Sequence, residues 1–208
     1  MIRAEDTGLV LLAAGRSRRF GGVDKLAERF LDKPLAFHVV TALEAVPFHC
    51  RIAVVCDTSL DFAARGYTVV ENPGAADGQG GSLRLGVQAA IDAGASAVLI
   101  ALADMPRVTA AHIYRLLDYA EGPDAVIASS NGVHPTPPAL FGSNHFPELL
   151  RCSGDEGARA LVRGGHHVIT RADELIDIDT PADLAALRAA YGLKPEVAAI
   201  RAAARRSD

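Results

Sequence analysis

The sequence predicts an α/β fold in which a mostly parallel sheet lies between two layers of helices, a three-layer α/β/α arrangement of the Rossmann-like kind. Two observations lead to this prediction. Short runs rich in valine, isoleucine and leucine alternate with longer stretches that have the period of a helix. The apolar runs show little polar–apolar alternation, as expected of strands that helices cover on both faces.

The length and composition indicate one well-filled domain, because half of the 208 residues are hydrophobic. We expect this domain to span residues 1–192, followed by a tail at 193–208 that is helical or disordered. The net charge of −4 argues against nucleic acid or an anionic membrane as a partner. The apolar runs are far shorter than the roughly 20 residues that cross a bilayer, and no signal peptide is visible. Three cysteines without CxxC spacing indicate neither disulfides nor a structural zinc site, so we expect a cytoplasmic protein.

The first 130 residues are expected to alternate strands with helices. Pro34, Ser82 and Thr109 signal the helix starts, and Ser82 is expected to cap its helix. The expected strands are Gly8–Ala13, Arg51–Cys56, Tyr67–Glu71, Ala97–Ala101 and Ala125–Ser129, and the expected helices are Pro34–Ala45, Ser82–Ala93 and Thr109–Ala120.

The later part of the chain is expected to hold shorter elements. Ser153 and Glu156 can form a capping box, and Thr180 followed by Pro181 has the order of an N-cap and a first-turn proline. The last helix should end near Gly192. Helices are expected at Asn144–Leu150 and Asp155–Arg163 and after Thr180, and short strands at His167–Arg171 and Leu175–Ile178.

The loop after the first expected strand, from Gly15 to Lys25, is the most informative segment. It holds three arginines, one lysine and three glycines. Glycines let backbone amides approach an anion closely, and the cations offset the charge of a polyphosphate. The loop contains neither a GxxxxGK[ST] nor a GxGxxG pattern. It is therefore interpreted as a phosphate-binding loop of another kind, with an exposed basic turn as the alternative.

A single carboxylate, Asp104, follows a fully apolar strand at its carboxyl end. Folds of this class bind ligands beyond the carboxyl ends of their strands. Magnesium typically takes one or two protein carboxylates together with substrate phosphates. Asp104 is therefore a candidate magnesium ligand, and the alternative is an aspartate that only caps a turn or helix.

Asp177 and Asp179 are expected on one face of a short strand, because side chains on a strand repeat every second residue. Both carboxylates could then approach the same ion. The competing interpretation for Asp179 is a cap for the helix that starts around Thr180.

The segment Gly78–Leu83 joins a strand to a helix, and its glycines allow close approach to a flat or anionic group. A binding loop and a plain glycine-rich loop are equally good interpretations. Elsewhere the sequence has no HExxH, no GxSxG and no spaced Cys/His cluster, which argues against zinc and serine hydrolases.

These motifs together resemble the MobA-like NTP transferases, a family that includes molybdenum cofactor guanylyltransferase and cytidylyltransferase. The resemblance runs in order from about Leu9 to Leu187. The family signature reads LAAGxSxRFG followed by a lysine, which corresponds to Leu12–Gly21 and Lys25. It implies a fold of the nucleotide-diphospho-sugar transferase type and magnesium-dependent nucleotidyl transfer.

The resemblance also implies roles for individual residues. The catalytic residues would be Lys25, Arg19 and Asp104. The metal would be held by Asp104 with Asp177 or Asp179. The block Gly154–Arg159, with Asp155 and Arg159, would lie on the acceptor side. The nucleotide would be bound by Leu12, Ala13, Ala14, Gly15, Arg19, Lys25, Gly80, Gly81 and Ser82.

Within the family, Ala14 and the Gly78–Leu83 loop are more similar to the cytidylyltransferases, because the guanylyltransferases usually carry LAGG. CTP is therefore favoured over GTP, and molybdopterin is the expected acceptor. One departure is that no Gly-His precedes Pro138, although the cytidylyltransferases usually have Gly-His-Pro there. A molybdenum hydroxylase that receives the finished cofactor would be an expected partner.

The expected reaction is in-line attack of an acceptor phosphate on the α-phosphorus of the NTP, with release of pyrophosphate. Positioning and charge stabilisation would carry catalysis. The alternatives are a guanylyltransferase of the same family, a nucleotidyltransferase for a sugar or polyol phosphate, and a nucleotide-binding cofactor chaperone without catalysis.

Overall fold

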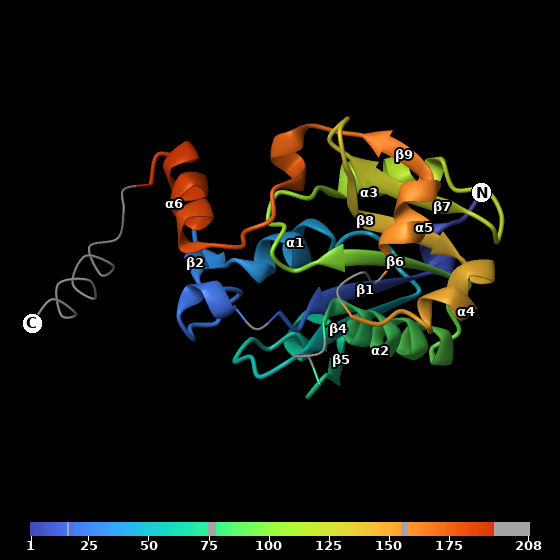
Figure 1. The fold of residues 1–208 in the computed structure, drawn as a ribbon, viewed down its shortest axis with the longest axis horizontal. Helices are drawn as coiled ribbons and strands as arrows, with labels where there is room; N and C mark the ends of the chain where they lie inside the picture. The colour runs from blue at the N-terminus through green and yellow to red at the C-terminus, as the bar shows by residue number, and fades with distance from the viewer. Residues whose placement is uncertain (16, 75–77, 155–157, 194–208) are drawn as a thin grey trace, which may run out of the picture.

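The computed structural model describes residues 1–15, 17–74, 78–154 and 158–193. A seven-stranded sheet forms its centre, in the order β5-β4-β1-β6-β8-β7-β9 (Figure 1). The strands are β1 Thr7–Ala13, β4 Cys50–Val55, β5 Thr68–Glu71, β6 Ala97–Leu102, β7 Val126–Ser130, β8 Pro135–Gly142 and β9 His166–Ile169, with β2 Arg29–Phe30 and β3 Lys33–Pro34 in a separate pair. The helices are α1 Ala36–Ala42, α2 Gln79–Asp92, α3 Ala110–Asp118, α4 Phe146–Leu149, α5 Arg159–Gly164 and α6 Pro181–Ala190.

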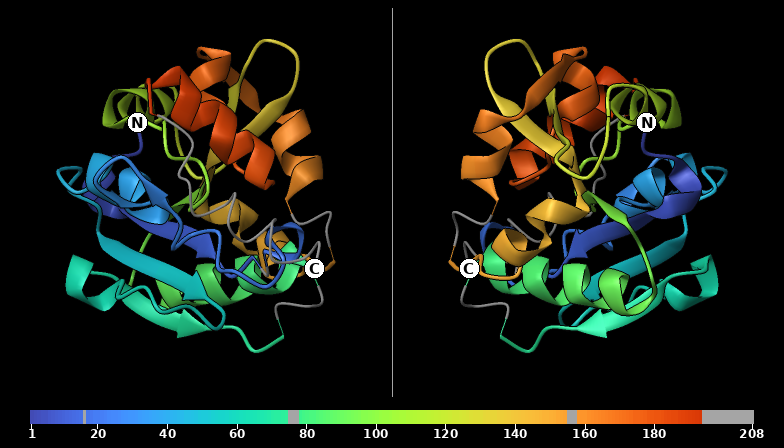
Figure 2. Two further views of the ribbon diagram at one scale, coloured as in Figure 1. Left: turned by 90° about the vertical axis from the view of Figure 1, so that its left-hand side faces the viewer. Right: turned by 90° about the vertical axis from the view of Figure 1, so that its right-hand side faces the viewer.

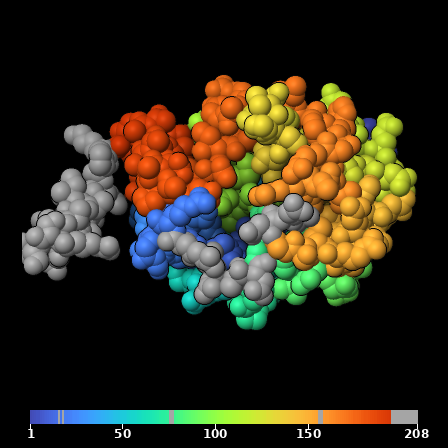
Figure 3. Space-filling model, in the orientation of Figure 1, coloured from blue at the N-terminus to red at the C-terminus, as the bar shows by residue number. Residues whose placement is uncertain are grey.

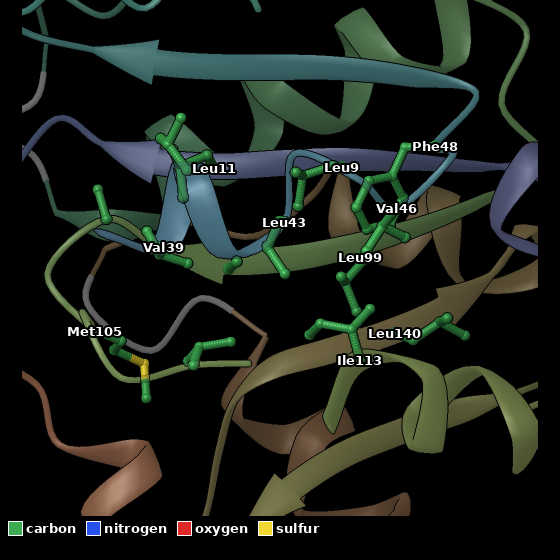
Figure 4. Close-up of a cluster of buried hydrophobic side chains, with 14 of the residues drawn as sticks. Leu9, Leu11, Val39, Leu43, Val46, Phe48, Leu99, Met105, Ile113 and Leu140 are labelled. Atoms are coloured by element: carbon green, nitrogen blue, oxygen red, sulfur yellow. The ribbon is translucent and has the colours of Figure 1, made fainter. Parts of the chain in front are cut away.

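Helices cover both faces of this sheet, which confirms the expected three-layer α/β/α fold (Figures 1 and 2). Strand β1 shows how one apolar run serves two cores. Leu9 and Leu11 pack toward α1 and α3 in the cluster of Figure 4. Val10 and Leu12 point to the opposite face and pack with residues of α2, α4 and α5. A strand buried on both faces therefore reads as a continuous apolar run.

The parallel part of the sheet aligns the carboxyl ends of its strands. Strand β1 pairs in parallel with β4 on one side and with β6 on the other, and Leu12 is the partner of both Val54 and Leu102. The five strands expected before residue 130 are confirmed to within one residue. The loops after β1 and β6 consequently begin at the same edge of the sheet.

Strand β8 was not predicted, and it is the antiparallel member of the sheet. It pairs with β6 on one side and β7 on the other, with an irregularity of register beside Ala128. Three prolines, Pro135, Pro137 and Pro138, lie in its first half. Proline cannot donate a hydrogen bond to a ladder and argues against a central strand. The prolines are accommodated here because β6 pairs only with Ala139–Gly142.

Two predicted helix starts are wrong. Pro34 belongs to β3, where it pairs with Arg29, so α1 begins at Ala36. Helix α2 begins at Gln79 and not at Ser82, because Gly80 and Gly81 are part of its first turn. Ser82 does not cap the helix. It lies buried inside α2 and accepts a hydrogen bond of 2.9 Å from Asn72 Nδ2.

The later elements agree with the sequence in part. The expected strand at Leu175–Ile178 is wrong. A 3-10 helix spans Ala172–Leu175, and the backbone N–H of Ile178 donates a hydrogen bond to the carbonyl of Asp104 instead of joining a strand ladder. Helix α6 has the expected Thr180 cap, and Gly192 with a φ of +70° follows its end. Helical structure is confirmed at 143–149, and β9 begins one residue before the expected strand. Helix α5 forms the end of the expected helix at 155–163, whereas Glu156 of the expected capping box and the tail after residue 193 lie outside the described residues.

Helix α6 closes a small third core against the β2–β3 pair. This core contains Phe30, Leu35, Ile178, Leu184 and Leu187. The surfaces of α6 and of the β2–β3 segment adjoin in the space-filling view (Figure 3). Because Ile178 is fully buried there, the neighbouring Asp177 and Asp179 are held beside the loop that follows β1.

None of the helices in the described parts of the chain combines the length and apolarity that crossing a membrane requires.

Candidate active site

A cleft of about 750 Å³ opens at the carboxyl ends of β1 and β6, on the side of the sheet covered by α2 and α5. Its floor is apolar and made by side chains from the same face of the sheet. Two of its sides are polar, and each is built from segments that are far apart in the chain. The floor residues are Leu12, Ile100, Leu102, Ala139 and Phe141.

Three carboxylates line one side of the cleft, from the end of β6 and the segment before α6. They belong to Asp104, Asp177 and Asp179 and are called the carboxylate wall below. The structure thus brings together the metal-binding candidates that the sequence predicted. Asp177 and Asp179 share the cleft although their segment is not a strand.

Lys25, which belongs to the loop after β1, forms hydrogen bonds with two of these carboxylates. Its Nζ donates to Asp104 Oδ2 at 2.7 Å, to the carbonyl of Ile178 at 2.9 Å and to Asp179 Oδ1 at 3.2 Å. The Lys25 side chain is 8% exposed, so all three protons of a buried ammonium are satisfied. Arg19 Nη1 donates to the other oxygen of Asp179 at 2.9 Å, in an exposed pair.

This network shifts the pKa values of its members. Removal from water lowers the pKa of Lys25, but the charge of Asp104 and the hydrogen bonds to Asp104 and Asp179 outweigh it, so the pKa is raised. Removal from water raises the pKa of Asp179, but hydrogen bonds from Lys25 and Arg19 lower it more. The ammonium and the Asp179 carboxylate are therefore both charged at neutral pH.

Asp177 behaves differently, because no cation among the described residues forms an ion pair with it. Partial removal from water raises its pKa, and the nearby negative charges of Asp104 and Asp179 raise it further. A bound cation would relieve this repulsion. In addition, Asp104 Oδ1 is buried and has no hydrogen-bond partner among the described residues. The carboxylate wall thus offers oxygen atoms that the described part of the chain does not use.

The loop after β1 is fastened so that Lys25 reaches the carboxylates. The backbone N–H of Lys25 donates to Ser17 Oγ at 3.0 Å, and Ser17 has a φ of +46°. Asp24 accepts from the Leu26 N–H at 2.9 Å and from Thr58 Oγ1 at 2.7 Å. The family signature contains the serine, but the roles of Asp24 and Thr58 required the structure.

The other nucleotide-binding candidates lie in different places. Leu12 lines the cleft floor. Ala13 points to the other face of the sheet, into the core with α1 and α3, and Ala14 is buried in the core with α2 and α5 on the face that carries the cleft. Apart from its chain neighbours, no atom of the described residues lies within 4 Å of the position that a Cβ on Gly15 would take. Gly15 therefore leaves open space after β1.

The first turn of α2 does not bring its glycines and serine into the cleft. A Cβ on Gly80 would lie 2.7 Å from the backbone of Ser153, and the Gly80 N–H donates to the Gly154 carbonyl at 2.8 Å. A Cβ on Gly81 would face Asn72 Nδ2 at 3.7 Å. The residues of α2 that do line the cleft are Gln79 and Leu83, neither of which the sequence singled out as a site residue.

The opposite side of the cleft is formed by α5 and the β7–β8 connection. Arg159, which the resemblance assigned to the acceptor side, lines it, while Asp155 lies outside the described residues. Sequence reasoning missed Arg163, which also lines it, although its position four residues after Arg159 predicts the same helix face. The β7–β8 connection contributes Asn131 and His134, and the start of β8 contributes Pro135, Thr136 and Pro137.

A buried hydrogen-bond chain supports that connection. Ser129 Oγ donates to the Pro138 carbonyl at 2.7 Å and accepts from His112 Nε2 at 2.8 Å. The hydroxyl has one proton, so His112 carries its proton on Nε2. Its Nδ1 is buried without a hydrogen-bond partner among the described residues, and burial lowers the pKa of the imidazole. Through this chain, the Ser129 hydroxyl satisfies the Pro138 carbonyl next to the irregularity of register in β7.

Comparisons with known proteins agree with this arrangement. Residues 9–171 match the family described as the MobA-like NTP transferase domain. Purine catabolism protein PucB of Bacillus subtilis is 33% identical over 198 residues, which is 87% of this chain and 95% of that protein. Molybdenum cofactor guanylyltransferase of Aliivibrio salmonicida is 41% identical over 69 residues, which is 33% of this chain and 34% of that protein.

The fold is also that of a known structure. The crystal structure of Rv0371C in complex with manganese, from Mycobacterium tuberculosis H37Rv, aligns with a TM-score of 0.70 at 24% identity, over 87% of this chain and 97% of that one. The chain belongs to the MobA-like NTP transferase family and is a nucleotidyltransferase.

Proposed function

We propose that this nucleotidyltransferase transfers CMP from CTP to the phosphate of molybdenum-loaded molybdopterin in a magnesium-dependent reaction that releases pyrophosphate. The observation that carries the catalytic part is that Asp104, which lines the cleft with Asp177 and Asp179, has a buried carboxylate oxygen, Oδ1, without a hydrogen-bond partner among the described residues. A carboxylate in that state is suited to a cation that arrives with the substrate.

The donor set of the carboxylate wall fits magnesium, which prefers oxygen ligands. Asp104, together with Asp177 or Asp179, would hold the ion. Within the described residues, no three His, Cys, Asp or Glu side chains are grouped so that they could hold a metal by themselves. The proposal therefore includes substrate phosphates among the ligands of the ion. When bound, it would supply positive charge next to the reacting phosphate oxygens.

The cationic residues of the loop after β1 would bind the triphosphate. Lys25 uses all three of its protons, and its bond to Asp179 is the longest of the three, at 3.2 Å. We expect Lys25 to exchange this bond for a phosphate oxygen, and Arg19 to exchange its exposed bond to Asp179 in the same way. Leu12 to Gly15 would border the nucleotide, with Ala13 contributing through its backbone.

In the proposed reaction, an oxygen of the acceptor phosphate attacks the α-phosphorus of CTP. The new P–O bond forms while the bond from the α-phosphorus to the bridging oxygen breaks, and pyrophosphate leaves with that electron pair. A phosphate monoester is anionic near neutral pH, so no general base is needed. Lys25 and Arg19 stabilise the developing charge, and the cleft aligns the two reactants.

The choice of CTP and molybdopterin rests on the sequence. Ala14 and the Gly78–Leu83 segment support CTP through their similarity to the cytidylyltransferases, and Gln79 of that segment borders the cleft. The similarity to a molybdenum cofactor guanylyltransferase supports molybdopterin as the acceptor. The protein would act in the cytoplasm and pass its product to a molybdenum hydroxylase.

The test is pyrophosphate release from CTP, GTP, ATP and UTP with magnesium, with and without molybdenum-loaded molybdopterin. We expect acceptor-dependent release from CTP. Release from GTP instead would identify a guanylyltransferase, and release only with a sugar or polyol phosphate would identify another acceptor. Nucleotide binding without any pyrophosphate release would contradict the proposal and favour a cofactor chaperone.

A further inference from the structure

Helix α5 presents two arginines to the cleft. Arg159, Val162 and Arg163 all line it, and they occupy positions i, i+3 and i+4 of the helix. Residues with this spacing share one helix face. Val162 is buried in the core beneath, which fixes the rotation of the helix. Arg159 and Arg163 therefore stand side by side on the cleft side of α5, and they are called the arginine wall below.

Neither guanidinium of the arginine wall forms an ion pair or a hydrogen bond within the described parts of the chain. Like charges at positions i and i+4 repel each other and destabilise a helix slightly. Other arginines of the protein, such as Arg107 and Arg188, have carboxylate partners. Two neighbouring arginines at the rim of a cleft, whose guanidinium groups no described residue pairs with, provide forked donors that match a doubly charged phosphate group.

The arginine wall is separated from the triphosphate-binding candidates by the width of several strands. Helix α5 packs on β7 and β8, whereas Lys25 and Arg19 belong to the loop after β1. Strands β6 and β8 follow β1 in the sheet, and each step is about 4.8 Å. Strands β1 and β8 are thus on the order of 10 Å apart, so the arginine wall and the loop after β1 lie over different parts of the sheet.

We propose that Arg159 and Arg163 form a subsite for a phosphate monoester dianion, in which Arg163 is a residue that determines specificity for the acceptor. This inference rests on the proposed function, because it assigns the subsite to the acceptor of that reaction. The acceptor would enter from the α5 side with its phosphate held by both guanidinium groups. The carboxylate wall opposite would repel the dianion unless a cation lies between them, so phosphate and metal would bind together.

The first experiment measures steady-state kinetics of Arg163→Ala with CTP and with the acceptor. Loss of one charge-assisted hydrogen-bonding partner should raise the acceptor KM on the order of 10- to 100-fold. The KM for CTP should stay within about twofold. Arg163→Lys, which keeps the charge but loses the fork, should give an intermediate acceptor KM. Equal effects on both substrates, or no effect on either, would overturn the assignment.

Arg151→Ala is the matched control, because Arg151 is an exposed arginine just after α4 that does not line the cleft. It should leave both KM values unchanged. If Arg151→Ala raised the acceptor KM as much as Arg163→Ala does, the effect would be one of general surface charge, and the subsite would be rejected.

A binding measurement separates this inference from the proposed reaction. Inorganic phosphate is titrated calorimetrically into the protein already saturated with magnesium and a non-hydrolysable CTP analogue. The unmodified protein should bind phosphate, and Arg163→Ala should bind it at least about tenfold more weakly. If no nucleotide gives pyrophosphate release but this difference is found, the reaction is wrong and the subsite stands. Equal phosphate binding by both proteins would remove the subsite.

Discussion

The two charged walls of the cleft are built in opposite ways. On the carboxylate wall, Lys25 and Arg19 hold Asp104 and Asp179 in ion pairs, and the ammonium is buried. On the arginine wall, Arg159 and Arg163 are exposed and have no partner among the described residues. One wall is therefore organised by the protein itself before any ligand binds. The other has donors that no described residue uses.

The largest effect is expected from Asp104→Asn, which removes one of the three carboxylate charges of the carboxylate wall but keeps an oxygen that accepts from Lys25. Turnover should fall on the order of 10³-fold, because the charge at the reacting phosphates is lost. The measurement is pyrophosphate release at saturating substrates, with Asp118→Asn on the exposed end of α3 as the control. Activity within a fewfold of the unmodified enzyme would contradict the role of Asp104.

Lys25→Met should have the largest effect on stability. Loss of the buried ammonium leaves two carboxylates without their cation. Breaking a buried ion pair in this way lowers the free energy of unfolding by about 3 kcal/mol. The free energy of unfolding is measured by urea denaturation. Lys33→Met, at a half-buried lysine without an ion pair among the described residues, should change it by less than about 0.5 kcal/mol. Equal effects would mean that the Lys25 network does not organise this wall.

A smaller effect is expected where the β7–β8 connection is supported. Burial keeps the pKa of His112 below 6.5 in the folded state, so the unfolded chain binds a proton more readily as pH falls through that value. The free energy of unfolding should therefore decrease below pH 6.5. His112→Gln keeps a donor for Ser129 and should remove this part of the pH dependence, as thermal unfolding between pH 5 and 7 would measure. His166→Gln, at an exposed histidine, should leave the pH dependence in place; if it does not, His112 is not its source.

The smallest effect on stability is expected for Arg163→Ala, in contrast to Lys25→Met. The change removes a like-charge repulsion and no ion pair, so the free energy of unfolding should change by no more than about 0.5 kcal/mol. Urea denaturation of the two variants side by side gives the comparison directly. A loss above about 1.5 kcal/mol would show that Arg163 has a structural partner, and the contrast between the walls would fail.

The sequence predicted the carboxylate wall better than the arginine wall, for a physical reason. Asp104 follows the long apolar strand β6, and Lys25 lies in the loop after the long apolar strand β1; periodicity detects such strands well. Asp179 was singled out although its expected strand is wrong, because its order along the chain after Lys25 and Asp104 matches a family pattern. By contrast, β8 was not predicted because of its prolines. The side of the cleft that β7 and β8 form was therefore not predicted either.

The errors around α2 have a related cause. Ser82 has the residue type of an N-cap, and local propensity favoured a helix start there. Contacts with distant residues decide otherwise, since Ser153 leaves no room for a Cβ on Gly80 and Asn72 binds the Ser82 hydroxyl. Similarly, nothing local indicates that Asp24 is tied to Thr58. Residues whose partners lie far away in the chain cannot be assigned from neighbouring sequence.

The reversed direction of β8 has a consequence for how substrate preference can change within this fold. Because β8 runs antiparallel to β7, the connection 131–134 is a simple hairpin that turns at the ligand-binding edge of the sheet. A crossover would have required a helix in its place. Hairpin loops accept insertions and deletions with little disturbance of the strands that carry them. This connection is therefore a natural position for grafting a new acceptor-recognition loop while the nucleotide-binding half remains as it is.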